Sequence, residues 1–295
     1  MALKVTGIIT ALVTPFDTDG KIAESSLRDI IEFQIKERVN GLFPCGSTGQ
    51  SALMTVEERE RVSEIVVDQT RRRVPVIIHV GCPDTGSTIR LAKHAERIGA
   101  DAIGCVTPYY YSSIDENSIL EHFRLVAESV AIPVYIYNIP RCTGINLRPQ
   151  LVSRIAEIRN IIGIKDSSHD FNQLVALLGI MPRDFSVING SDAVMFPAFM
   201  MGAKAAVAAS ANAVPTICSN IYRHTISGEF SAAITEQFRL NSLLPALNTP
   251  PIAPLMECLR LRGIKSGNVR RPLRELSEKE ISNMTILLKQ AHVIE

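Results

Sequence analysis

A lysine that directly follows an apolar run is the residue with the clearest chemical potential in this sequence. Lys165 comes after residues 161–164 and is followed by Asp166. If the run is a buried strand, its end partly encloses the amine, and burial favours a neutral amine over an ammonium. A neutral amine can attack a carbonyl carbon and form a Schiff base. An ion pair between Lys165 and Asp166 is the alternative, and the residues alone leave both open.

Two tyrosines in the segment YIYNIP could supply a proton donor. Tyr135 and Tyr137 lie on one face if this segment is a strand, because side chains alternate along a strand. A phenol at a strand end can pass a proton or donate a hydrogen bond to an oxyanion. Packing of both rings at the mouth of a barrel explains the pair equally well.

The segment PCGSTGQ could bind a small anion. Gly46 and Gly49 permit a tight turn, so the backbone N–H groups around Ser47 and Thr48 can converge on one point. The loop lacks the Gly-Lys-Ser/Thr ending of a nucleotide-binding loop, which favours a carboxylate over a triphosphate. A purely structural turn is the alternative.

Other kinds of site have little support. The six histidines show no spacing typical of a metal centre, so we expect no metal, and without a Gly-x-Ser-x-Gly motif a hydrolase triad has no support either. The net charge of +1 favours neither a nucleic acid nor an anionic membrane as partner. The sequence shows no long apolar span, no signal-peptide pattern and no paired cysteine spacing, so we expect a cytoplasmic protein with reduced thiols.

Eight short apolar runs could position these residues. They begin at residues 7, 41, 76, 102, 134, 161, 185 and 205, about 28 residues apart on average. Amphipathic segments at 25–39, 55–70, 85–99 and 116–130 lie between them. This alternation predicts an α/β fold, a (β/α)8 TIM barrel, which has about 31 residues per unit. A doubly wound sheet is the alternative, but the first run is not followed by a Gly-rich dinucleotide motif.

The strand pattern also predicts the domain organisation. It stops after about residue 212 while helical periodicity continues, so we expect the barrel over residues 1–225 and a helical C-terminal extension over 226–295. In such barrels the active site lies at the C-terminal ends of the strands, where the three motifs above would meet. A basic stretch from Arg260 to Arg274 could bind phosphate, but a solvated junction between helices is the simpler interpretation.

Five motifs together resemble the dihydrodipicolinate synthase and N-acetylneuraminate lyase family. They are GLFPCGSTGQSALMTVEER, VTPYYY, YIYNIPRCTG, GIKDSS and INGSD, in this order within residues 41–192. The opening TGIITALVTPFDTDGKI and the later RPLRELS are also similar to the family. The resemblance implies a (β/α)8 barrel with a helical extension, a homotetramer, and class I aldolase chemistry on pyruvate and an aldehyde without a cofactor.

The resemblance also implies roles for individual residues. Lys165 would form the Schiff base, and Tyr137 would relay protons with Thr48 and Tyr110, the last of which reaches into a neighbouring subunit's site. Ser47 and Thr48 would bind the carboxylate of pyruvate. The other substrate-binding positions that the resemblance implies are Gly190, Val207, Ser167 and Asp192.

Departures from the family pattern bear on the substrate. The synthases carry an arginine five residues after the relay tyrosine, where this chain has Cys142, and Arg141 lies one position earlier. The lyases carry an acidic residue and a serine where this chain has Ala193 and Ala209. We therefore expect an aldolase that cleaves or forms a 2-keto-3-deoxy sugar acid or a similar 2-keto acid.

Other members of the family remain alternatives. The first is the synthase reaction, in which pyruvate condenses with aspartate semialdehyde and Arg141 binds the carboxylate of the aldehyde. Less favoured are an N-acetylneuraminate lyase, a dehydratase of the same family and a non-catalytic binder of keto acids.

Overall fold

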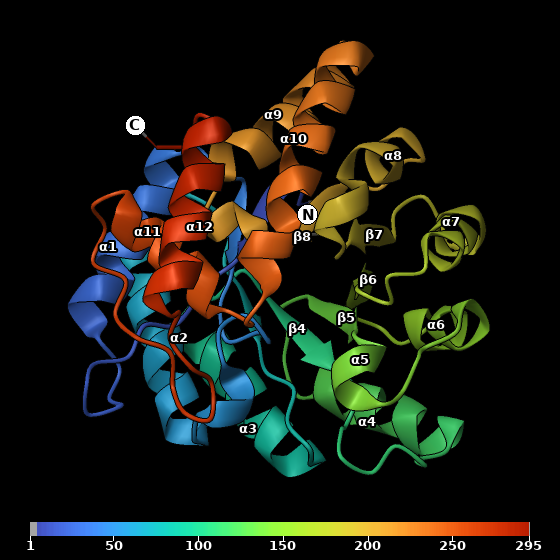
Figure 1. Cartoon of the computed structure of the whole chain (residues 1–295). Helices are drawn as coiled ribbons and strands as arrows, with labels where there is room; N and C mark the ends of the chain where they lie inside the picture. Colours follow the sequence, from blue (N-terminus) through green and yellow to red (C-terminus); the bar gives the residue numbers. More distant parts are fainter. Residues whose placement is uncertain (1–4, 295) are drawn as a thin grey trace.

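Eight parallel strands form the centre of the molecule in the computed structural model, which describes residues 5–294 (Figure 1). All eight lie within or over the apolar runs of the sequence. They are buried almost throughout, because helices cover the outside of the sheet and side chains fill its inside. The strands are β1 (Gly7–Ala11), β2 (Gly41–Phe43), β3 (Ile77–His79), β4 (Ala102–Val106), β5 (Val134–Asn138), β6 (Ile161–Asp166), β7 (Ser186–Asn189) and β8 (Ala205–Ala208).

The strands close into a barrel. They pair in the order β2-β1-β8-β7-β6-β5-β4-β3, with each pair parallel. A parallel bridge between Leu42 and Val76 joins the two ends of this order, beside β2 and β3. The predicted (β/α)8 TIM barrel is therefore confirmed. Because the strands are parallel, all their C-terminal ends meet at one end of the barrel.

Amphipathic helices make the outer layer. Those between the strands are α1 (Glu24–Lys36), α2 (Val56–Thr70), α3 (Thr85–Arg97), α4 (Glu116–Glu128), α5 (Pro140–Thr143), α6 (Pro149–Ala156), α7 (Phe171–Ile180) and α8 (Met195–Met200). Short 3-10 turns cover 51–53, 192–194 and 210–212. Local sequence sets where the helices begin: Thr55 and Glu58 form a capping box at α2, and Asp84 and Asp115 accept hydrogen bonds from the first turns of α3 and α4.

Four helices follow β8. They are α9 (Pro215–Ile226), α10 (Phe230–Asn248), α11 (Ala253–Leu261) and α12 (Glu278–Gln290), coloured orange to red in Figure 1. Helix α9 packs against β1 and α8, and α10 packs along α9. The predicted boundary at residue 225 falls beside the end of α9, and the division into barrel and extension stays a prediction. No helix among residues 5–294 is long and apolar enough to cross a membrane.

The basic stretch of the sequence attaches the extension to the barrel. Arg262 pairs with Glu37, the residue directly after α1, at 3.3 Å. Arg270 pairs with Glu58 of α2 at 2.7 Å, and its guanidinium lies 4.0 Å from the centroid of the Phe16 ring. Two further pairs in this stretch are Arg260 with Glu257 and Arg274 with Glu280. The stretch is thus largely neutralised by neighbouring carboxylates, which supports the helix junction and not a phosphate site.

Candidate active site

Lys165 lies near the end of β6 with its side chain inside the barrel mouth. The residue is 5% exposed, and its Nζ lies 4.0 Å from the centroid of the Tyr137 ring and 4.4 Å from that of Phe43. Within residues 5–294 it forms no ion pair. The two rings therefore hold the amine in place without engaging it in a salt bridge.

Asp166 does not pair with this lysine. Its Oδ1 accepts hydrogen bonds from Asn138 Nδ2 at 2.8 Å and from Gln173 Nε2 at 3.2 Å, and its Oδ2 accepts one from Ser168 Oγ at 2.7 Å. Burial raises the pKa of Asp166, and the hydrogen bonds oppose this shift. Because consecutive residues of a strand point to opposite faces, the Asp166 carboxylate lies on the outer face of β6 while the Lys165 amine faces inward.

Tyr137 stands beside Lys165 on the adjacent strand. The two residues are paired in the register of β5 and β6. The Tyr137 ring meets Phe43 edge-on, with centroids 5.6 Å apart, and its hydroxyl lies 3.5 Å from Ser47 Oγ. Tyr135 lies inside the barrel on the same face of β5, paired with Gly163, where an added Cβ would come within 2.7 Å of the Tyr135 ring. Tyr135 therefore packs in the barrel interior, and Tyr137 reaches the site.

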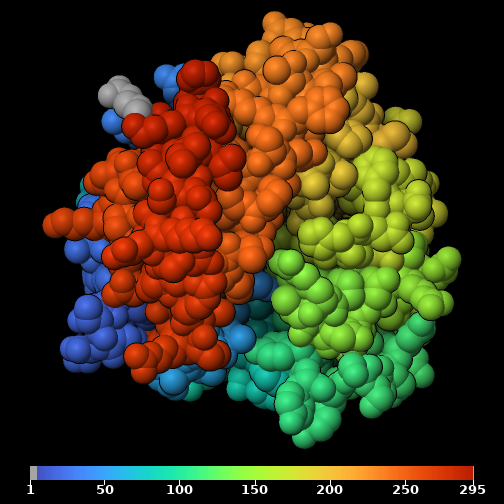
Figure 2. Space-filling view, viewed as in Figure 1, coloured from blue at the N-terminus to red at the C-terminus, as the bar shows by residue number. Residues whose placement is uncertain are grey.

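A cavity of about 260 Å³ opens above these residues. In the space-filling view, the surface is hollowed between the orange segment that holds α10 and the green segment that holds α5 (Figure 2). This cavity includes every residue to which the family resemblance assigns a role, except Tyr110. Those that line it are Ser47, Thr48, Tyr137, Arg141, Lys165, Ser167, Gly190, Asp192 and Val207.

The Ser47–Thr48 loop follows β2 and is tightly constrained. Cys45 has a φ of 57°, in the left-handed region that non-glycine residues rarely adopt. A Cβ on Gly49 would come within 3.0 Å of the Leu12 carbonyl oxygen, so the loop can pass so close to β1 only with glycine there. The sequence thereby holds two hydroxyls and their backbone N–H groups at the cavity wall.

Gly190 and Asp192 line the side of the cavity formed after β7. A Cβ on Gly190 would come within 2.0 Å of Ser167 Oγ and 2.7 Å of the Asp166 carbonyl oxygen. Asp192 Oδ2 accepts a hydrogen bond from Ser210 N at 2.8 Å. Burial raises the pKa of Asp192, and the Ser210 N–H opposes that shift.

Tyr110 lies outside the cavity of its own chain. It is 84% exposed, has a φ of 84°, and packs edge-on against Tyr111, with ring centroids 5.2 Å apart. Tyr111 is itself 70% exposed. The pair forms an exposed aromatic surface after β4, and the expected role of Tyr110 in a neighbouring subunit's site stays a prediction.

Arg141, and not Cys142, lines the cavity. Arg141 lies in the short helix α5, which begins at Pro140 directly after β5. His169, in the loop after β6, also lines the cavity. Its φ is 60°, and its Nδ1 lies 3.4 Å from Ser191 Oγ. Burial lowers the pKa of His169, and the nearby Arg141 guanidinium lowers it further. Arg141 therefore brings a positive charge to this end of the cavity, beside a histidine whose pKa is lowered.

Two kinds of lining residue were not indicated by the sequence. His169 directly follows the motif GIKDSS and Ser191 lies within INGSD, so their places after β6 and β7 could have identified them. Leu244 and Asn248 come from α10, in the extension. Their approach depends on how α10 crosses the barrel mouth, which hydrogen bonds of Gln237 to Phe196 N and to the Asp192 carbonyl help to set.

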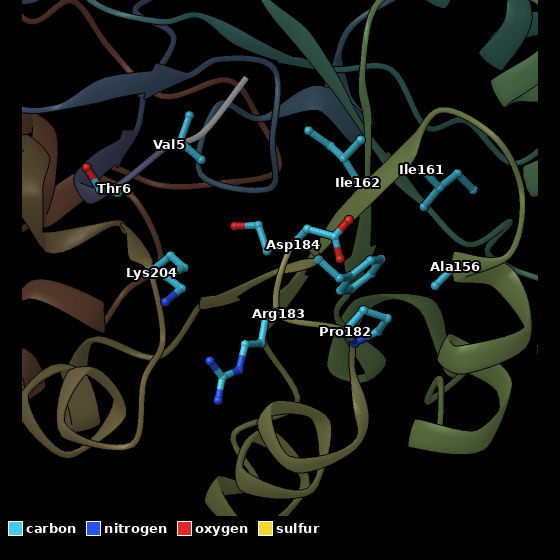
Figure 3. A pocket seen from close by; sticks show the side chains of 11 residues that line it. Val5, Thr6, Ala156, Ile161, Ile162, Pro182, Arg183, Asp184 and Lys204 are labelled. Atoms are coloured by element: carbon cyan, nitrogen blue, oxygen red, sulfur yellow. The ribbon is translucent and has the colours of Figure 1, made fainter. Parts of the chain in front are cut away.

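A larger cavity, of about 500 Å³, lies at the opposite end of the barrel (Figure 3). The side chains that line it come from residues at or just before the starts of β1, β6, β7 and β8, including Val5, Ile162 and Lys204. It contains neither Lys165 nor Tyr137. Active sites of such barrels lie at the C-terminal ends of the strands. The smaller cavity, which contains Lys165 and Tyr137, is therefore the candidate active site.

Comparison with known proteins identifies the family of this chain. The Dihydrodipicolinate synthetase family matches residues 4–291. The chain is 36% identical over 291 residues to a 4-hydroxy-tetrahydrodipicolinate synthase from Acetivibrio thermocellus, covering 98% of each chain. It is 39% identical over 274 residues to the protein of the same name from Syntrophus aciditrophicus, covering 92% of this chain and 93% of that one.

Solved structures give the same result. A prophage protein of the dihydrodipicolinic acid synthase family from E. coli, determined in complex with pyruvate, superposes with a TM-score of 0.93 at 33% identity, covering 98% of this chain and 99% of that one. A dihydrodipicolinate synthase from Bacillus anthracis also gives 0.93, at 30% identity and with the same coverage. By full-length sequence similarity and by fold, this chain belongs to the dihydrodipicolinate synthetase family of carbon–carbon lyases.

Proposed function

We propose that Lys165 forms a Schiff base with pyruvate and that the protein joins the resulting enamine to an aldehyde. The observation that carries this proposal is a buried amine with no ion pair among residues 5–294, facing a cavity beside a tyrosine hydroxyl. The known pyruvate complex of a relative of the same fold supports it.

The chemistry follows from the arrangement of these groups. The Lys165 amine attacks C2 of pyruvate, and loss of the carbonyl oxygen as water leaves a protonated imine. Removal of a proton from C3 then gives an enamine, whose C3 attacks the aldehyde carbon, and the aldehyde oxygen takes up a proton. Hydrolysis of the imine releases the product and restores the amine. In this proposal Tyr137 carries the protons, and Ser47 and Thr48 hold the carboxylate. All three residues line the cavity, and the Tyr137 hydroxyl lies 3.5 Å from Ser47 Oγ, which supports these roles.

Aspartate semialdehyde is the aldehyde that we propose first. The curated relatives described above are named 4-hydroxy-tetrahydrodipicolinate synthases, so the comparisons favour the synthase alternative over our first expectation of a sugar-acid aldolase. Arg141 supports this choice because it lines the cavity, where it can bind the carboxylate of the aldehyde. It would take the role of the family's arginine, whose position is occupied by Cys142 in this chain.

A 2-keto-3-deoxy sugar acid remains the second candidate. The cavity wall beyond Lys165 carries Ser167, Ser191 and Asp192, which are groups that bind hydroxyls. A polyol chain would satisfy them, whereas aspartate semialdehyde brings an amine and a carboxylate.

Borohydride reduction tests the shared chemistry. Incubation with pyruvate and borohydride should add a stable pyruvyl group to Lys165, located by peptide mass mapping, and Lys165→Ala should remain unmodified. No adduct on Lys165 would overturn the proposal. Turnover of pyruvate with aspartate semialdehyde, glyceraldehyde and N-acetylmannosamine in parallel then identifies the aldehyde, and binding of pyruvate with no turnover would support the non-catalytic binder.

We also propose a homotetramer that works in the cytoplasm. The exposed Tyr110–Tyr111 pair is a surface that a neighbouring subunit can cover, and it would bring Tyr110 to that subunit's cavity. All six cysteines are free, as expected in a reducing compartment. Light scattering should give the mass of four chains, and a monomeric mass would contradict the role of Tyr110.

A further inference from the structure

A buried histidine contacts both Tyr137 and the Ser47–Thr48 loop, which we call the substrate loop. His79 is the last residue of β3 and is 4% exposed. Its ring packs edge-on against Tyr137, with centroids 5.6 Å apart and an angle of 89° between the planes. The ring also lies 6.1 Å from that of Phe43. His79 and Phe43 thus both contact the Tyr137 ring, over which Lys165 Nζ lies.

The other contact of His79 is to the loop that carries Ser47 and Thr48. Its Nδ1 lies 2.7 Å from the Cys45 carbonyl oxygen. Because a carbonyl oxygen only accepts, Nδ1 carries the hydrogen and donates it. The His79 backbone N–H also donates to the Pro44 carbonyl at 3.1 Å. The end of β3 is therefore bound to two successive residues at the base of the loop.

His79 is neutral in this position. Burial holds its pKa well below the usual value, and the charges of Arg59 and Lys165 lower it further, whereas the hydrogen bond to Cys45 acts in the opposite sense. With the hydrogen on Nδ1, Nε2 carries only a lone pair, and it has no hydrogen-bond partner among residues 5–294. The ring therefore fills space beside Tyr137 without adding a charge near the amine.

A buried arginine fixes His79 from outside the barrel. Arg59 of α2 is 3% exposed and donates from Nη2 to the His79 carbonyl at 2.8 Å and from Nη1 to the Gly81 carbonyl at 2.9 Å. A Cβ on Gly81 would come within 3.1 Å of His79 Nε2 and 2.5 Å of Val106 Cγ1. The backbone on each side of the ring is thus held, and the ring itself has little freedom.

The position of Cys45 gives the hydrogen bond its importance. This residue adopts a left-handed φ of 57°, a conformation that costs a non-glycine residue free energy and persists only when its surroundings impose it. Ser47 and Thr48 follow two and three residues later. A change at the Cys45 carbonyl would therefore move both hydroxyls relative to Tyr137, whose Oη is 3.5 Å from Ser47 Oγ.

We propose that His79 is a positioning residue that fixes the substrate loop and Tyr137 relative to each other. Its Nδ1 hydrogen bond holds the loop, and its ring packs against Tyr137. This inference rests on the proposed Schiff-base chemistry and extends it to a residue that touches no substrate. The two contacts use different parts of the side chain, so two substitutions separate them.

His79→Phe keeps a ring beside Tyr137 and removes the donor to Cys45. We expect the dissociation constant and the KM for pyruvate to rise about tenfold, which is the effect of losing one buried hydrogen bond, while kcat stays within about threefold. His79→Asn keeps an N–H donor at the Nδ1 position and removes the ring. We expect pyruvate binding within about threefold of the unchanged protein, and a rate of imine formation that falls about tenfold because Tyr137 loses its support.

Imine formation is measured by borohydride trapping at timed intervals, and pyruvate binding by calorimetry on the full chain. His122→Phe is the matched control, because His122 is equally buried, lies in α4 and contacts Thr85 and Cys105 instead of the site. This control should leave both constants unchanged.

Each outcome decides the role of His79. Opposite effects of the two variants on binding and on imine formation support the proposal. Equal effects of both variants on both constants, no effect, or failure of both variants to fold would show a merely structural residue and overturn it. Absence of a Lys165 adduct in the unchanged protein would instead contradict the proposed function, and this inference with it.

Discussion

Tyr137 and Lys165 occupy paired positions on β5 and β6, and the amine lies 4.0 Å from the centre of the phenol ring. Register alone produces this contact, because paired residues of parallel strands point to the same side of the sheet. The ring therefore shields one side of the amine while its hydroxyl reaches the substrate loop, 3.5 Å from Ser47 Oγ. An amine held in this way is available to attack a carbonyl.

Replacing Tyr137 by phenylalanine should separate shielding from proton transfer. The Tyr137→Phe ring still packs against Lys165 and Phe43, so we expect pyruvate binding to change little. Loss of the hydroxyl should lower kcat about 100-fold to 1,000-fold, as for removal of a general acid–base group. Steady-state kinetics with pyruvate and the active aldehyde measure this. The exposed Tyr111→Phe is the control, and equal losses in both variants would contradict the assignment.

Arg141 should determine affinity for an anionic aldehyde. Loss of a charge-assisted hydrogen bond in Arg141→Ala should raise the KM for aspartate semialdehyde at least about tenfold, since such bonds contribute about 1.5–3 kcal/mol. The KM for pyruvate and turnover of an uncharged aldehyde should change little. Arg183→Ala, at the opposite end of the barrel, is the control. An unchanged KM for the semialdehyde would remove the main structural support for the synthase reaction.

Placing an arginine at position 142 tests the same point from the other side. If the family position is the better one, Cys142→Arg should lower the KM for aspartate semialdehyde and rescue Arg141→Ala. Because Cys142 is exposed, the change should cost little stability, within about 0.5 kcal/mol. A double variant that binds the semialdehyde no better than Arg141→Ala alone would show that an arginine at position 142 cannot replace Arg141.

Gly190 should tolerate no side chain. An added Cβ would lie within 2.0 Å of Ser167 Oγ and 2.7 Å of a backbone oxygen, so Gly190→Ala must displace the end of β6. We expect a loss of about 1–3 kcal/mol in the free energy of unfolding, together with weaker pyruvate binding. Gly179→Ala in α7, where a Cβ meets nothing within 4 Å, should instead add about 0.5–1 kcal/mol. Urea unfolding of both variants gives the comparison, and similar effects on stability would be inconsistent with it.

Asp192 should make stability depend on pH in a definite direction. Its pKa is raised in the folded protein, so the folded state binds this proton more tightly than the unfolded state. The contribution is complete below the unfolded value of about 3.8 and is lost as the pH rises through the folded value.

The substitution Asp192→Asn removes that dependence while keeping an acceptor for Ser210 N. Relative to the unchanged protein, this variant should gain stability as the pH is raised from about 3.8, by at most about 1.4 kcal/mol per pH unit. Urea unfolding between about pH 3 and pH 7 measures the difference. Parallel stability curves for the two proteins would show that the Asp192 carboxyl titrates alike in both states.

Much of the architecture was open to prediction because it depends on local patterns. Apolar runs bounded by turns and separated by amphipathic helices are sufficient for a barrel of alternating strands and helices, and all eight expected strands are present. The end of each run also marks the edge where polar side chains gather. For that reason Lys165, Tyr137 and the Ser47–Thr48 loop could be expected at one site before their positions were known.

Contacts between segments that are distant in the sequence could not be predicted from local patterns. No pattern around residue 244 or 248 indicates that α10 crosses the mouth of the barrel, since its path depends on packing and hydrogen bonds to segments some 40 residues away or more in sequence. His79 reads as an ordinary core histidine until its hydrogen bond to Cys45 is seen, because a strand position gives the face of a side chain but not its partner.

The sequence by itself determined the family, the barrel and the place of Lys165 at the end of a strand, because each depends on residue type and on spacing along the chain. Only the tertiary structure decided that Lys165 is free of Asp166, that Arg141 lines the cavity where Cys142 does not, and that the extension closes one side of the site. These are matters of direction and distance between side chains brought together by folding. A few degrees of strand twist or one turn of a helix changes them without altering the pattern of residues.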